Sequence, residues 1–144
     1  MYKLFLLFTF FPFLSFSQDY NYRAYDKAVK YYNQHQYEKS KDLLSKLIDN
    51  FSEWKDPNLL MSTILLNENK IDSAVSYLLN IYNVNDPIGM KEIADIYYKH
   101  GLYEKALYYF DQPVLSDTDN DIARYSKNCQ FAINSIQDSF DIES

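Results

Sequence analysis

The chain has very little cysteine, glycine and proline. Its 144 residues include one cysteine, Cys129, together with two glycines and four prolines. The scarcity of the two residues that interrupt helices favours long helices joined by short connections. A single cysteine excludes an intramolecular disulfide, so the fold must be stabilised by packing. Two isolated glycines also exclude a glycine-rich phosphate-binding loop.

Basic residues are also few, and they are not clustered. Fourteen Lys and Arg residues stand against twenty Asp and Glu residues, which gives a formal net charge of −6. The two arginines are Arg23 and Arg124. Nucleic-acid binding needs a concentrated positive surface, so we expect no nucleic-acid partner. The negative net charge is expected to serve solubility.

Long apolar runs are missing outside the N-terminus. Residues 1–17 contain one charge, Lys3, then an apolar stretch over residues 4–14, and then small residues before Gln18. This order is typical of a secretory signal peptide. The apolar stretch is too short for a membrane span, which needs ~20 residues. We expect an exported protein, in the periplasm or associated with the outer membrane, with no transmembrane segment in the mature chain and a polar linker at residues 18–23.

The chain does contain a ten-residue segment that recurs. Residues 31–40 and 97–106 both read Tyr-Tyr, four variable residues, Tyr-Glu-Lys and a small residue, and a degenerate copy lies between them. The anchor residues of the three copies are Tyr37, Ile71 and Tyr103. Their spacings are 71 − 37 = 34 and 103 − 71 = 32 residues. A period in the low thirties is typical of stacked helical hairpins.

Apolar residues spaced three and four apart predict three helical hairpins. The hairpins cover residues 24–55, 56–85 and 86–115. The second and third begin with Asp-Pro, at Asp56 and Asp86, where Asp can cap a helix and Pro suits its first turn. A last amphipathic helix, at residues 121–139, is expected to cap the array. No segment shows convincing strand alternation, so we predict an all-α fold.

These copies resemble the tetratricopeptide repeat (TPR), a helix pair of about thirty-four residues. The matching small residues are Ala28, Ser62 and Ala94 in the first helices and Ser40, Ala74 and Ala106 in the second helices; the matching large residues are Leu44, Leu78 and Phe110. The resemblance covers residues 24–113 and implies a TPR-like α-solenoid of three helical hairpins plus a C-terminal capping helix. The second copy departs from the pattern because it lacks the aromatic residues, and the third has Pro113 where a small residue is expected.

The last helix carries Ala123, Cys129, Phe131, Ala132 and Ile133. This pattern is similar to a helix that closes the N-terminal TPR region of Gram-negative OmpA-family envelope proteins. The resemblance implies a protein-interaction module or scaffold in the cell envelope. The alternative is an N-terminal structural or oligomerisation segment of a larger OmpA-family outer-membrane protein.

A peptide groove is the functional site that the TPR resemblance implies, because the first helix of each pair lines the concave face. Tyrosine has an apolar body with a polar tip, and asparagine can both donate to and accept from a peptide backbone. We therefore expect a protein or peptide partner. The predicted groove residues are Tyr25, Tyr32, Asn33, Leu66, Asn67, Asp95, Tyr98 and Lys99. Four other tyrosines are expected in the repeat core: Tyr31, Tyr37, Tyr97 and Tyr103.

Catalysis, cofactors and metals are not expected. His35 and His100 fall at equivalent places about two repeats apart, too far to share a zinc ion, which needs three or four ligands at ~2 Å. The acidic residues near Asp121 lack the glycine and glutamate of a calcium-binding EF-hand loop. Cys129 lies on an apolar stripe without a residue to activate it, which predicts an inert thiol. No nucleophile-and-base arrangement is found, so we predict that the protein is not an enzyme.

Overall fold

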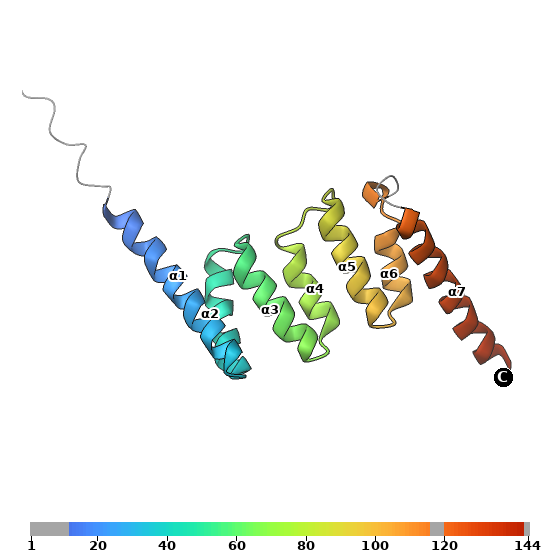
Figure 1. Ribbon diagram of the computed structural model, residues 1–144, viewed down its shortest axis with the longest axis horizontal. Helices are drawn as coiled ribbons and strands as arrows, with labels where there is room; N and C mark the ends of the chain where they lie inside the picture. The colour runs from blue at the N-terminus through green and yellow to red at the C-terminus, as the bar shows by residue number, and fades with distance from the viewer. Residues whose placement is uncertain (1–11, 116–119, 143–144) are drawn as a thin grey trace, which may run out of the picture. The chain divides into compact units, whose positions relative to one another are not determined.

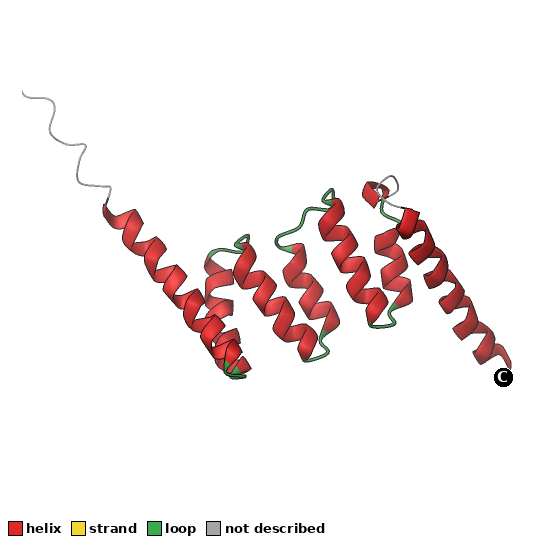
Figure 2. Ribbon diagram, in the orientation of Figure 1, coloured by secondary structure: helices red, strands yellow, loops and turns green. Residues whose placement is uncertain are grey.

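The computed structural model describes residues 12–115 and 120–142, and over these residues every regular element is helical (Figures 1 and 2). This confirms the predicted all-α class. The helices are α1 (Pro12–Asn33), α2 (Tyr37–Asn50), α3 (Lys55–Asn67), α4 (Ile71–Leu79), α5 (Pro87–Lys99), α6 (Tyr103–Phe110) and α7 (Asn120–Ile142), with a short 3₁₀ helix, η1, at Pro113–Leu115. None of the described helices is long and apolar enough to cross a membrane.

Neighbouring helices pack in sequence. Helix α1 packs on α2, α5 packs on α6, and α7 packs on α6, while α4 contacts α5. The chain divides into two compact units, Met1–Ile64 and Leu65–Ser144, and the division falls within α3. The core of the first unit includes Ala28, Leu44 and Ile64, and that of the second includes Leu78, Ile93 and Phe110.

The same backbone turn closes all three hairpins. His35, Asn69 and Gly101 have positive φ angles of 57°, 57° and 71°. After each, the next residue donates its N–H to a carbonyl five residues earlier, a Schellman ending that satisfies the free carbonyls of the helix. The bonds join Gln36 to Tyr31, Lys70 to Leu65 and Leu102 to Tyr97, at 2.9, 2.8 and 3.0 Å. The period seen in the sequence is therefore also a period in the backbone.

Small residues lie where the sequence analysis places the helix crossings. All six are at most 2 % exposed: Ala28, Ser40, Ser62, Ala74, Ala94 and Ala106. Helices pack about 8–10 Å apart, so only small side chains fit at the closest approach. Ser40 is tolerated there because its Oγ donates to the carbonyl oxygen of Ala28 at 2.9 Å, which satisfies a buried hydroxyl.

One helix start agrees with the sequence analysis and two differ. Helix α3 begins at Lys55, one residue before Asp56, so Asp56 lies in the first turn and not at the predicted capping position. At α5, Asp86 caps the helix by accepting from the N–H of Ile88 at 3.0 Å, with Pro87 in the first turn. Helix α1 instead begins at Pro12 and includes residues 18–23, for which a linker was predicted. That segment contains neither Gly nor Pro, and the ring of Tyr22 packs edge-on against Trp54 at 5.1 Å. Of the predicted signal peptide, residues 1–11 lie outside the described part of the chain.

Candidate functional site

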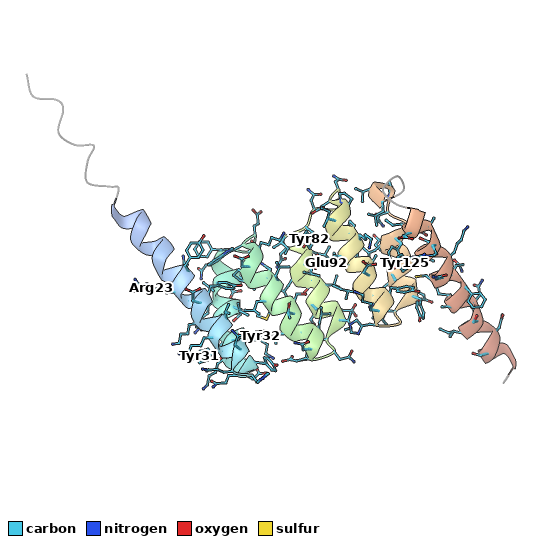
Figure 3. The ribbon with its side chains drawn as sticks, viewed as in Figure 1. Arg23, Tyr31, Tyr32, Tyr82, Glu92 and Tyr125 are labelled. Atoms are coloured by element: carbon cyan, nitrogen blue, oxygen red, sulfur yellow. The ribbon has the colours of Figure 1, made fainter. Side chains whose placement is uncertain are left out.

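An aromatic cluster joins three helices of the second unit. Tyr125 on α7 meets Tyr98 on α5 with ring centroids 5.3 Å apart and the planes at 73°. Tyr125 also stacks on Phe110 of α6 at 5.5 Å with an interplanar angle of 9°. Phe110 is buried, whereas Tyr98 and Tyr125 are half-buried. The buried phenylalanine thus holds two tyrosines that remain accessible, and Figure 3 shows Tyr125 on α7.

Charged side chains surround these tyrosines. Lys91 pairs with Asp95 at 2.8 Å on α5, and its Nζ lies 5.9 Å from the centroid of the Tyr125 ring. The guanidinium of Arg124 lies 5.4 Å from the same centroid. Both distances are within the range of cation–π attraction. We call this surface the α5–α7 patch; it consists of Lys91, Asp95, Tyr98, Arg124 and Tyr125.

The composition of the α5–α7 patch suits recognition. Tyrosine and arginine are the residue types that most often dominate the energy of protein interfaces. The patch offers aromatic faces and edges, two cations and one carboxylate, all at least partly exposed. A partner could place apolar, aromatic or acidic groups here without leaving a buried charge unpaired.

The predicted groove residues fall into both units. Tyr25, Tyr32 and Asn33 belong to the first unit, and the other five belong to the second. Only Asp95 and Tyr98 join the α5–α7 patch. The last residues of α1, α3 and α5 are exposed; they are Asn33, Asn67 and Lys99. Leu66 is half-buried, and a groove that runs through all eight residues stays a prediction.

Two predicted groove tyrosines pack against the second helix of their own hairpin. The rings of Tyr32 and Tyr37 are 5.7 Å apart, and the equivalent rings of Tyr98 and Tyr103 are also 5.7 Å apart. A third, Tyr25, is tilted against Trp54 at 5.7 Å. Burial, and then the nearby carboxylates of Asp56 and Asp26, raise the pKa of Tyr25.

Three residues of the patch are not among the predicted groove residues: Lys91, Arg124 and Tyr125. The last helix was expected to cap the array, but no local pattern specifies which of its residues come next to α5. One signal was present, because Arg124 is one of two arginines in the chain and is adjacent to a tyrosine.

A second aromatic group lies in the first unit. Tyr22, Phe51 and Trp54 meet edge to face, with Trp54 5.1 Å from Tyr22 and 6.3 Å from Phe51. Together with Asn21 they line a hollow of about 180 Å³. The loop below it is held by buried Asn58, whose Nδ2 donates to the carbonyl oxygens of Ser52 and Trp54, each at 2.8 Å.

Cys129 is buried and Asp121 is paired with Arg124, so two of the residues considered for chemistry have structural surroundings of their own. Among the described side chains, no group of three His, Cys, Asp or Glu is placed to hold a metal ion. Burial, and then the charge of Asp111, raise the pKa of the buried Cys129 thiol, which keeps it protonated. Asp121 is paired with Arg124 at 3.0 Å, and its acidic neighbours at 117 and 119 lie outside the described residues.

Another hollow lies in the second unit. It has a volume of about 340 Å³ and lies between the start of α6 and the second half of α7. Its apolar lining comes from Leu102, Ile133 and Ile136, and its charged lining from Glu104 and Lys105.

No known protein-family model matches this chain, and the search of curated proteins finds no match either.

Proposed function

We propose that the chain is an exported TPR-like α-solenoid module that binds a peptide or protein partner in the cell envelope. Three features support the solenoid: helices that pack in sequential pairs, a turn that recurs at steps of 34 and 32 residues, and small residues buried at each crossing. Solenoids of this kind use the surface that their stacked helices create for binding rather than for catalysis.

The observation that carries the binding role is the α5–α7 patch. Tyr98 and Tyr125 pack on a buried phenylalanine, so their rings are held in place before a partner arrives. Pre-ordered aromatic groups lose little conformational entropy on binding, which favours affinity. Tyr98 and Asp95 belong to the predicted groove, and Lys91, Arg124 and Tyr125 extend it. We expect a modest affinity, roughly micromolar or about −8 kcal/mol, because the surface is small.

The test begins with capture of partners from an envelope extract. The recovered partner is then titrated against the purified chain by calorimetry. The Arg124→Ala variant should bind about five- to tenfold more weakly, because the guanidinium beside Tyr125 is lost. Lys127→Ala removes the same charge from another exposed position of α7 and should change the affinity less than twofold. Equal affinity of both variants and the unmodified chain would exclude the α5–α7 patch as the binding site.

A second pair of variants tests the aromatic half of the patch. Tyr98→Ala should abolish detectable binding, whereas Tyr108→Ala should not, because Tyr108 is 65 % exposed and lies outside the patch. Circular dichroism must show that both variants stay helical. The prediction of export is tested separately, by N-terminal sequencing of the protein from the envelope, which should begin at Gln18.

A further inference from the structure

The second unit contains a carboxylate held by a tyrosine and a lysine. Asp72, in the first turn of α4, accepts a hydrogen bond from the hydroxyl of Tyr97 on α5 at 3.0 Å. It also accepts from Nζ of Lys105 on α6, at 2.6 and 2.7 Å to its two oxygens. The Lys105 ammonium lies 5.5 Å from the centroid of the Tyr97 ring. These bonds lower the pKa of Asp72, with the bond to Lys105 as the largest cause.

The first unit contains the same tyrosine–lysine pair. Tyr31 and Lys39 lie 66 positions before Tyr97 and Lys105, since 97 − 31 and 105 − 39 are both 66. Each tyrosine is the third residue from the end of its helix, and each lysine is the third residue of the next helix. The Lys39 ammonium lies 5.6 Å from the centroid of the Tyr31 ring, which matches the 5.5 Å of the other pair. The equivalent turn between the helices places both pairs alike.

The pair in the first unit differs from the second because no carboxylate of the described residues contacts it. Lys39 donates to the side-chain oxygen of Gln36 at 2.9 Å, and among the described side chains no Asp or Glu pairs with Lys39 or Lys27. Tyr31 remains half-exposed at the end of α1 (Figure 3), whereas Tyr97 is only 5 % exposed. The expectation that Tyr31 lies in the repeat core is therefore met less fully than the same expectation for Tyr97.

Positive charge is higher at the first pair than at the second. Lys27 lies 66 positions before the fully buried Ile93, and its ammonium is 5.7 Å from the centroid of the Tyr31 ring. Tyr31 thus has a cation from each of two helices. Residues 21–50 carry six basic against four acidic side chains, although the whole chain has fourteen against twenty. A site of this composition favours an anionic group.

We propose that Tyr31, Lys39 and Lys27 bind the carboxylate of an Asp or Glu in the first turn of a helix of a partner protein. The partner helix would lie against α1 and α2 as α4 lies against α5, with its acid bonded to the Tyr31 hydroxyl and the Lys39 ammonium. The contacts of Asp72 with Tyr97 and Lys105 show how such a carboxylate would be bound. The excess of positive charge around Tyr31 is complementary to the charge of the carboxylate. This site is distinct from the α5–α7 patch and does not depend on it.

The probe for this site is a lactam-stapled helical peptide that copies residues 70–80, which include Asp72 in the first turn of α4. A second peptide with Asp72→Asn is its matched control. Binding of each labelled peptide to the full chain is measured by fluorescence anisotropy. The Asp peptide should bind at least fivefold more tightly than the Asn peptide, and Lys39→Gln or Tyr31→Phe in the protein should remove most of that difference.

The control variant is Lys46→Gln, which removes an equal charge from an exposed position of α2. It should change the affinity for the Asp peptide less than twofold. Equal affinities of the two peptides, an equal effect of Lys46→Gln and Lys39→Gln, or no binding at all would overturn the proposal. Sedimentation of the chain alone provides a further check. If the chain forms a dimer that Lys39→Gln dissociates, the site binds a second copy of the chain, which would also refute the proposal.

Discussion

Replacing Gly89 by alanine should destabilise the protein, although alanine normally stabilises a helix. Gly89 is the third residue of α5 and is buried against Tyr82, in the loop before that helix. A Cβ added at Gly89 would overlap with Cγ of Tyr82 and would lie 2.5 Å from its Cβ and 2.7 Å from its Cδ1. These atoms are at the base of the tyrosine side chain, so rotation of its tip cannot relieve the overlap.

The other end of Tyr82 is held as well. Its hydroxyl donates to Oε2 of Glu92 at 2.7 Å, and the two side chains lie next to each other in Figure 3. Making room for the methyl group therefore requires the Tyr82 ring to move, or α5 to shift. Overpacking of this kind costs ~1–3 kcal/mol. Loss of the bond to Glu92 would add about 1.5 kcal/mol.

The opposing gain is smaller. Alanine is preferred over glycine in a helix interior by about 1 kcal/mol, and by less in the first turn. The net change for Gly89→Ala is then about 1.5–3.5 kcal/mol of lost stability. For a domain of this size, that corresponds to a fall of roughly 5–14 °C in Tm.

Thermal unfolding followed by circular dichroism measures this change, and a double-mutant cycle assigns its cause. In a Tyr82→Ala background the obstacle is absent, so Gly89→Ala should be neutral or stabilising there. A higher Tm for Gly89→Ala in the unmodified protein would refute the packing argument. The same loss in both backgrounds would show that the cost does not come from Tyr82.

Three further predictions concern the hairpins and the tyrosines. Ala106→Leu should cost ~1–3 kcal/mol in denaturant unfolding, because it overpacks a helix crossing, and an unchanged midpoint would contradict the assigned register. Gly101→Ala should cost about 1 kcal/mol, because a φ of 71° is strained for alanine, whereas the added Cβ has no neighbouring group within 4 Å. Gly101→Asn should cost less, because Asn69 adopts the same conformation. Equal Tm values for the two variants and the unmodified chain would exclude this reasoning. Burial, and then the bond to Glu92, raise the pKa of Tyr82 from 10.0 to about 12. The stability that this tyrosine contributes is therefore present below pH 10 and is lost as the pH rises through about 12. Tyr82→Phe should reduce the fall of the unfolding free energy over this pH range, and an unchanged fall would disprove the assignment.

The helical hairpins could be predicted because their signals are local and periodic. A helix crossing tolerates only small side chains, so Ala74 and Ala106 mark it in the sequence. Asp86 and Pro87 mark a helix start through hydrogen bonding and backbone geometry that involve only neighbouring residues. The left-handed turn at His35 was not predicted, because the sequence analysis considered this histidine only as a metal ligand, although histidine is one of the residues enriched in that conformation.

The features that the sequence analysis missed depend on contacts between distant residues. The early start of α1 is accompanied by packing of Tyr22 on Trp54, 32 residues away. The α5–α7 patch likewise requires Tyr125 to reach Tyr98, which lies two helices earlier in the chain. Both contacts depend on how helices pack, and hydrophobic periodicity reports only which face of a helix is buried.

The two copies of the recurring segment illustrate why repetition does not by itself reveal a binding site. Tyr97 and Lys105 are occupied by Asp72 of the same chain, so in that copy the motif stabilises the packing of α4 on α5 and α6. Tyr31 and Lys39 have the same geometry but no carboxylate among the described residues, and Lys27 replaces a buried isoleucine beside them. If the motif served only to build the fold, replacing Tyr31 and Lys39 should leave the affinity for every partner unchanged. The peptide titration separates these cases, because only a binding role makes the affinity depend on both the acid of the peptide and Lys39 of the protein.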